Sequence, residues 1–258
     1  MSAMIVLPAL AAATVAGLAA AFLFGRMASR RARRDRRQHL DTVRTLMALV
    51  DAADVLTRGH SYRVSRLSLR VGRALGMDGA ALEELEYAAL LHDVGRVAIR
   101  ADILQKPGPL SAGERDLVQT HPEVGFDIVS GLGFSAAAAD IVRSHHEQPD
   151  GKGYPRGLAA TDIPMGSRII MVAAALDAMT VDRPYRRGMT PAMAMAEIAR
   201  HAGTQFDAAV VTALQSLYEA GTLFDEFEAD ELARLTHRWS PSGLDDELGG
   251  RRIERRRA

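Results

Sequence analysis

Residues 81–96 read ALEELEYAALLHDVGR, and this stretch decides what kind of fold the chain forms. Its apolar residues recur at three- and four-residue spacing, which is the pattern of an amphipathic helix. The helix closes on the adjacent pair His92 and Asp93, just before Gly95. Because neighbouring residues on a helix do not share a face, one side chain points inward while the other reaches sideways. That arrangement suits a pair that grips one or two metal ions.

The rest of the chain continues this helical pattern. From residue 60 to about 220 nearly every segment has helical periodicity, and stretches containing Gly and Pro separate the segments. No stretch alternates convincingly between apolar and polar residues as a half-buried strand does. The 258 residues are 48% hydrophobic and 25% charged, which is ordinary for a globular protein with a real core. We therefore expect an all-α body.

Histidines gather at the predicted helix ends. The chain has no cysteine, which excludes disulfides and thiolate metal sites and fits a reducing compartment. Any metal must therefore be held by histidine and carboxylate side chains, a set that suits iron, manganese, zinc or cobalt. Two such ions a few ångströms apart are a common device for phosphoester hydrolysis. The candidate metal ligands are His60, His92, Asp93, His121, His145 and His146.

The N-terminal region differs sharply from the body. Residues 1–25 carry no charged side chain, and about 20 apolar residues suffice to cross a bilayer as a helix. Seven arginines and one aspartate follow between Arg26 and Arg37, which the positive-inside rule places in the cytoplasm. A secretory signal peptide is the alternative, but its positive charge would precede the apolar stretch. We expect a single-pass anchor in the cytoplasmic membrane, with the arginines facing lipid headgroups and no nucleic acid polymer as partner.

The predicted organisation has four parts. Residues 1–25 form the transmembrane anchor, and residues 26–57 form a basic juxtamembrane segment and a linker helix. Apolar residues at helical spacing in 38–57 suggest pairing with a second copy of the chain. The main domain spans residues 58–224. Residues 225–258 form a charged tail that is partly disordered.

Several short motifs of the main domain follow one another in a characteristic order: GHSYRV, HDVGR, ILQKPGPLSAGE, THPEVG, HHEQPDGKGYP and DAMTVDRPYR. Together they resemble the successive motifs of the HD-GYP family, a branch of the HD phosphohydrolase superfamily that hydrolyses cyclic di-GMP. The resemblance covers residues 54 to about 220. It implies an all-α, HD-type helical bundle, here preceded by the transmembrane helix.

The resemblance also implies roles for particular residues. The six candidate ligands named above stand where the family holds a two- or three-metal centre, and iron or manganese are the favoured ions. Gly153, Tyr154 and Pro155 form the family signature, and Tyr154, Arg183 and Arg186 stand where the family contacts the dinucleotide. Arginine forks suit phosphate oxygens. Asp93 and Arg96 are the expected catalytic residues.

Three departures from the family pattern matter. Arg96 replaces a lysine, which keeps a cation but not one that can give up a proton. Leu56 stands where some members have a glutamate that supports a third metal, so two ions are the expected maximum. Ala174 stands where the family has a metal-ligating aspartate, and losing that carboxylate should lower metal affinity. Asp177 follows one turn later, about 4.5 Å along the helix, and we expect it to support the site without replacing the missing ligand.

Two functions remain open at this point. The first is a membrane-anchored phosphodiesterase that converts cyclic di-GMP to pGpG or GMP with two divalent ions. The second is a catalytically weakened module that binds cyclic di-GMP and signals through a protein partner. An HD hydrolase acting on another phosphoester is a third reading, which the intact Tyr154 loop disfavours.

Overall fold

The computed structural model describes residues 22–27, 30–31, 42–43, 59–182 and 187–224. The chain divides into two units, Met1–Arg44 and Thr45–Ala258. The predicted tail, 225–258, lies outside the described residues, as does most of the predicted segment 26–57 with its proposed dimer helix. The domain bounds expected from the sequence therefore stay predictions.

The first unit corrects the expectation of a membrane anchor. Residues 22–27 form a helix, whereas residues 1–21 lie outside the described part of the chain. A helix must run for about 20 residues to cross the roughly 30 Å of hydrocarbon. No helix among the described residues is both long and apolar enough to do so. The predicted single-pass location in the cytoplasmic membrane is contradicted by this finding.

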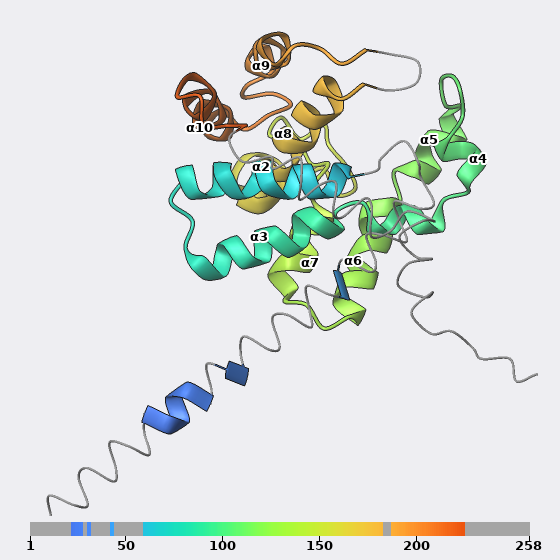
Figure 1. The fold of residues 1–258 in the computed structure, drawn as a ribbon. Coiled ribbons are helices and arrows are strands. Elements are labelled where there is room, and N and C mark those ends of the chain that lie inside the picture. The colour runs from blue at the N-terminus through green and yellow to red at the C-terminus, as the bar shows by residue number, and fades with distance from the viewer. Residues whose placement is uncertain (1–21, 28–29, 32–41, 44–58, 183–186, 225–258) are drawn as a thin grey trace, which may run out of the picture. The chain divides into compact units, whose positions relative to one another are not determined.

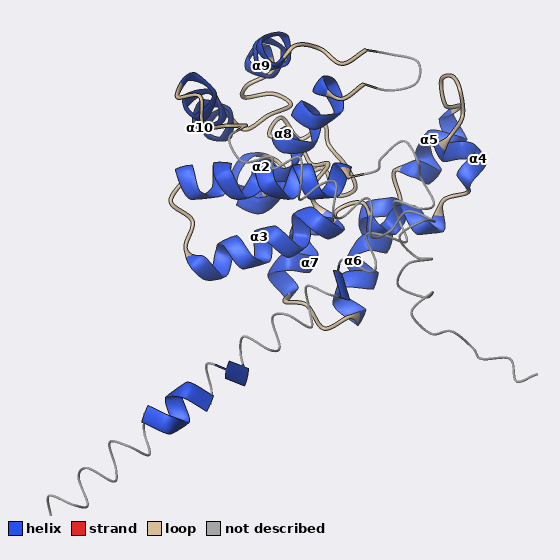
Figure 2. Ribbon diagram, in the orientation of Figure 1, coloured by secondary structure: helices blue, strands red, loops and turns tan. Residues whose placement is uncertain are grey.

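The second unit is built from helices, as predicted. In the described residues its longer elements are α2 (His60–Ala74), α3 (Gly79–Leu91), α6 (His121–Gly131), α7 (Ala136–Arg143), α8 (Met165–Thr180), α9 (Pro191–Arg200) and α10 (Ala208–Glu219). Shorter pieces are α4 (Ala101–Leu104), α5 (Ala112–Val118) and the 3-10 turns η2 (Val94–Ala98) and η3 (Ala160–Asp162). Figure 2 shows helices and loops but no strand in this described part of the chain, consistent with the predicted all-α class.

Helices α2 and α3 form an antiparallel pair that fixes where the site lies (Figure 1). Because the two run in opposite directions, the N-terminus of α2 and the C-terminus of α3 meet at one end of the pair. His60 begins the first helix and His92 directly follows the second. Helix α8 also packs along α2 and carries Asp177 to the same end. His60 and Asp177 are therefore in contact although they lie 117 positions apart in the sequence.

The core lies between α2, α3, α7 and α8. Val64 and Leu85 are fully buried on α2 and α3, and Ile170 and Leu176 are fully buried on α8. Burying an aliphatic side chain stabilises the fold by roughly 1.5–3 kcal/mol. Several helix starts are capped by short polar side chains, for instance Asp78, which accepts a hydrogen bond from the Ala81 backbone N–H at 2.8 Å. The helices that position the site are therefore set by both packing and caps.

Candidate metal centre

Three histidines take their orientation from the ends of helices. His92 Nδ1 lies 2.9 Å from the Ala89 carbonyl oxygen, which belongs to the last turn of α3. The last four carbonyls of a helix have no partner within it, so a side-chain donor just beyond the end can satisfy one. A carbonyl only accepts, and Nδ1 must therefore carry the proton. The neutral ring then presents Nε2 as a lone pair on its far side.

The same arrangement occurs at two other helix ends. His121 Nδ1 lies 2.7 Å from the carbonyl of Val118, the last residue of α5. His145 Nδ1 lies 2.6 Å from the carbonyl of Val142, in the last turn of α7. The expected gathering of histidines at helix ends thus has a specific cause. Each helix end fixes one ring and aims its Nε2 into the same buried space.

His60 is oriented differently, by an acidic side chain from another helix. Its Nδ1 lies 2.7 Å from Asp177 Oδ2, which is a strong acceptor. Asp177 is also bound by Arg63, whose Nε lies 2.5 Å from Oδ1 and whose Nη2 lies 3.1 Å from Oδ2. Burial raises the pKa of the Asp177 carboxyl, but the hydrogen bonds from His60 and Arg63 outweigh it and leave that pKa lowered. The carboxylate is ionised and holds His60 with Nε2 turned inward.

Asp93 lies at the centre of these rings and is only 3% exposed. Its Oδ2 is 3.4 Å from His92 Nε2 and 3.9 Å from His60 Nε2, and its Oδ1 is 3.4 Å from His121 Nε2. Arg96 Nε approaches Oδ1 to 2.8 Å as an ion pair, although within the described residues neither oxygen accepts a well-aligned hydrogen bond. A buried carboxylate with so few donors is costly unless a cation completes it.

The spacing between the rings fits bound metal. His121 Nε2 and His145 Nε2 are 3.2 Å apart although both present lone pairs. Two nitrogens held at about 2.1 Å by one ion would lie about 3.0 Å apart in octahedral and about 3.4 Å apart in tetrahedral geometry. The donor atoms form two groups, and within each group all of them lie within 4.8 Å of one another. One group is Asp93, His121, His145 and His146, and the other is His60, His92 and Asp93. The donor set therefore fits divalent cations that accept nitrogen and oxygen ligands.

Burial also keeps the imidazoles ready to bind metal. Desolvation lowers the pKa of His145 and His146 well below the usual histidine value, and it lowers the pKa of His121 as well. Burial raises the pKa of Asp93, but Arg96 and the neighbouring histidines bring it well below its usual range. Burial thus favours the neutral, metal-binding form of these three rings, beside one ionised carboxylate.

The close approach of two backbones brings the Asp93 turn to His121. A Cβ atom built on Gly95 would lie 2.7 Å from the Gly125 nitrogen and closer still to the His121 carbonyl oxygen. Only glycine leaves room for η2 to pass so near α6. The glycine that follows the His92 and Asp93 pair is therefore a packing requirement of the site.

The loop after His146 is held by a residue that sequence reasoning did not single out. Glu147 is fully buried, and its carboxylate accepts the backbone N–H groups of Arg156 at 2.7 Å and Leu158 at 2.9 Å. The loop carries Tyr154, whose ring stacks on His146 with centroids 4.7 Å apart and planes at 19°. The sequence shows only that an acid directly follows two candidate ligands, and its backbone partners could not be predicted from it.

Gly153 and Pro155 flank Tyr154 in the same loop. A Cβ atom on Gly153 would lie 2.5 Å from the Glu147 Cα and from the His146 carbonyl oxygen, so the loop folds tightly back on the histidine pair. The Tyr154–Pro155 peptide bond is cis. The structure thus places the signature beside the cluster. Whether Tyr154 contacts a nucleotide stays a prediction, and Arg183 and Arg186 lie outside the described residues.

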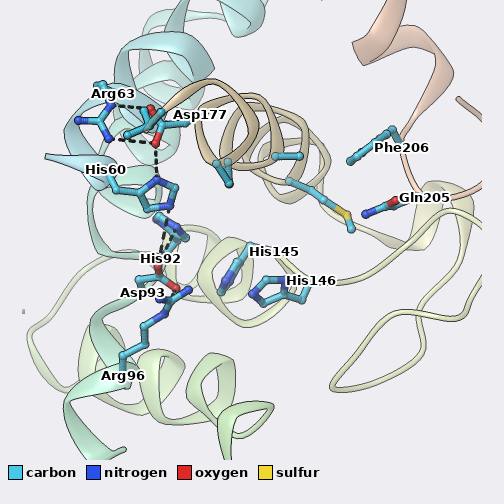
Figure 3. A pocket seen from close by; sticks show the side chains of 15 residues that line it. His60, Arg63, His92, Asp93, Arg96, His145, His146, Asp177, Gln205 and Phe206 are labelled. Carbon is cyan, nitrogen blue, oxygen red and sulfur yellow. Dashed lines mark hydrogen bonds and ion pairs between the residues drawn. The ribbon is translucent and has the colours of Figure 1, made fainter. Parts of the chain in front are cut away.

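A pocket of about 220 Å³ opens over the cluster. Figure 3 shows His60, Asp93 and His146 on its wall, with Gln205 and Phe206 on the far side of the view from His60. Ala174 also lines it. Pockets that enclose a drug-sized ligand are commonly about 300–1,000 Å³, so a larger molecule would enter this one only in part. Sequence reasoning did not assign Arg63, Gln205 or Phe206 to the site; Arg63 lies within the motif GHSYRV, but its contact with Asp177 joins residues far apart in the sequence.

The fold and the site define an all-helical protein with a buried histidine–aspartate centre of the kind that binds divalent metal. A family model described as HD domain matches residues 44–210, which is more than half of the chain. The chain therefore belongs to the HD domain family. This confirms the family expected from the sequence motifs. That Ala174 stands in place of a metal-ligating aspartate stays a prediction, because the family match does not address single positions.

Curated relatives and solved structures agree with this assignment. A cyclic di-GMP phosphodiesterase of Thermotoga maritima is 35% identical over 193 residues, covering 74% of this chain and 52% of that protein. A 3'3'-cGAMP-specific phosphodiesterase of Vibrio cholerae is 36% identical over 167 residues, covering 65% and 36%. The chain thus spans about half or less of the length of these relatives. An HDG"Y"P protein from Bdellovibrio bacteriovorus shares the fold with a TM-score of 0.55 at 23% identity, covering 71% of this chain and 62% of that one.

Proposed function

We propose that this chain is a metal-dependent phosphodiesterase that hydrolyses cyclic di-GMP to pGpG or GMP. The observation that carries the proposal is the inward convergence of imidazole Nε2 atoms on Asp93, a carboxylate shared by two groups of donors. Relatives named for cyclic dinucleotide hydrolysis support the substrate class. Divalent ions, iron or manganese by preference, would supply an acidified water and neutralise charge on the phosphodiester.

The charges around the pocket favour an anionic substrate. Asp93 is paired with Arg96, and Asp177 is paired with Arg63. Each buried acid is thus already balanced by a guanidinium before any ion binds. The charge of bound divalent ions would therefore be left to attract a phosphodiester, rather than being cancelled by the protein.

The reaction itself is a hydrolysis, and its atoms balance simply. Water adds to phosphorus, the bond from phosphorus to the ribose 3' oxygen breaks, and a proton passes to that oxygen. One such event opens the ring to pGpG and a second gives two GMP. Tyr154, stacked on His146, limits the motion of that ring, while Arg96 lines the pocket beside Asp93 and can reach toward a phosphate.

A second function is supported by the Ala174 position in the pocket wall. One donor group has four members and the other three, so the second group should bind its metal ion less tightly than a fully ligated one would. The chain would then bind cyclic di-GMP without appreciable turnover and report its presence to a protein partner. We rank this second because the residues of both donor groups, including the group of three, converge in the folded chain.

The test is an assay of the full chain with Mn²⁺ or Fe²⁺ under anaerobic conditions, with cyclic di-GMP and 3'3'-cGAMP compared by chromatography. We expect turnover of cyclic di-GMP that Asp93→Asn abolishes. Asp102→Asn is the matched control, because Asp102 is an exposed acid on α4 paired only with Arg100 among the described residues. Binding of cyclic di-GMP with no turnover under either metal would replace the enzyme with the binding module.

A further inference from the structure

We propose that the two metal positions are unequal, so that one ion is held tightly and the other exchanges with the surroundings. The inference rests on the proposed metal-dependent function and adds a form of control to it. The tight position is the group of Asp93, His121, His145 and His146. The weak position is the group of His60, His92 and Asp93. The amount of available metal would then set what fraction of the chains carries both ions.

The first step of the argument is the number of donors. The tight position has four donor atoms from this chain, whereas the weak position has three, and Asp93 is common to both. An ion at the weak position must therefore share its single carboxylate with the neighbouring ion. That carboxylate is the single acid of both groups, so the weak position differs from the tight one in having fewer imidazole ligands, which lowers its affinity for a divalent cation.

The second step is the open side of the weak position. Ala174 and Asp177 both line the pocket on α8, one turn apart. The methyl group of Ala174 cannot bind metal, and no other described acid falls within the weak group. That side of the position is accordingly open to water or to a substrate oxygen.

The third step is that both carboxylate oxygens of Asp177 already accept hydrogen bonds. Its Oδ2 accepts from His60 Nδ1 at 2.7 Å and its Oδ1 from Arg63 Nε at 2.5 Å, and the residue is only 4% exposed. To bind an ion directly it would have to turn away from His60 and Arg63, and weakening these charge-assisted contacts is costly in a buried place. Asp177 is therefore a positioning residue: it acts on the weak ion through His60.

The test counts metal without using activity. The full chain is stripped with a chelator and titrated with Mn²⁺, with bound ions counted by equilibrium dialysis and the coupled pair detected by electron paramagnetic resonance. We expect two binding steps separated by about tenfold or more, the scale on which single changes around a metal site act. Ala174→Asp should tighten the second step toward the first. Asp177→Asn should weaken the second step and leave the first unchanged.

Ala192→Asp is the matched control, since Ala192 is exposed on α9 and places the same charge away from the pocket. The inference is overturned if the wild-type chain binds two ions with equal affinity, if it binds only one, or if folded Ala174→Asp leaves the second step unchanged. These outcomes are separable from the fate of the proposed function. If the chain hydrolyses cyclic di-GMP but binds both ions with equal affinity, only the inference of unequal metal positions is refuted. If the two affinities differ but no hydrolysis occurs, only the proposed enzymatic function is refuted.

Discussion

Replacing Glu147 by glutamine should loosen the signature loop and destabilise the fold by a measurable amount. The carboxylate is fully buried and accepts two backbone N–H groups, those of Arg156 and Leu158. Hydrogen bonds to charged groups contribute about 1.5–3 kcal/mol each. Glutamine keeps one acceptor oxygen but turns an NH2 group toward the other backbone N–H. We therefore expect a loss of about 2–4 kcal/mol in the free energy of unfolding.

The assay is chemical denaturation of the full chain followed by circular dichroism, supported by thermal melting. For a domain of this size, about 1 kcal/mol corresponds to roughly 2–4 °C in Tm, so a fall of roughly 5–15 °C is expected. Glu219→Gln is the control: Glu219 is exposed at the end of α10, and its change should stay within about 0.5 kcal/mol. If Glu147→Gln costs less than about 1 kcal/mol, the loop is not held as the structure indicates.

Three further results are expected. Gly95→Ala should reduce the Mn²⁺ bound per chain, measured by dialysis, because the added methyl group would push the Asp93 turn away from the His121 backbone; unchanged metal content would contradict this. Gln205→Ala should weaken cyclic di-GMP binding by up to about tenfold in calorimetry while metal content stays the same, since its amide lines the pocket away from the ligands. Asp207→Asn should cost about 1 kcal/mol at neutral pH by weakening the 2.8 Å pair with Arg168.

The pH dependence of that last change has a definite sign. Burial raises the pKa of Asp207, but its bonds to Arg168 and to the start of α10 leave that pKa lowered in the folded chain. A lowered carboxyl pKa stabilises the fold above the unfolded value of about 3.9, and the gain disappears as pH falls through the folded value. Denaturation curves of the wild type and Asp207→Asn should therefore converge below about pH 4. A difference that persists there would point to packing and not to charge.

The structure brings together the six residues that the sequence singled out as candidate ligands, and their role as metal ligands stays a prediction. His92, His121 and His145 each stand just past a helix end, and helix ends can be found from periodicity together with Gly and Pro. That they would lie together was implied by the family resemblance and not by any local pattern. Asp177 was expected to support the site, but the ligand that it holds, His60, and its own partner Arg63 could not be predicted. Asp177 and Arg63 are 114 positions apart, and no local pattern relates them.

The N-terminal prediction failed for a different reason. Hydropathy over residues 1–25 indicated a spanning segment, but composition reports only that a helix could enter a bilayer. The helix described in that region covers residues 22–27, and no described helix meets the length and hydropathy that a span requires. Loop contacts such as those of Glu147 were missed because backbone partners carry no sequence signature.

The bonds from three histidines to the carbonyls at the ends of their own helices have an evolutionary consequence. Because Ala89, Val118 and Val142 contribute only backbone oxygen, their side chains can change through mutation without turning the rings. His60 depends instead on the side chain of Asp177. A single substitution on α8 can therefore misdirect that one ring, while the other three keep their aim. Substitutions at the three carbonyl-bearing positions should therefore leave the ring orientations unchanged. Among the groups that orient the rings, Asp177 is the one whose substitution should most readily reduce function.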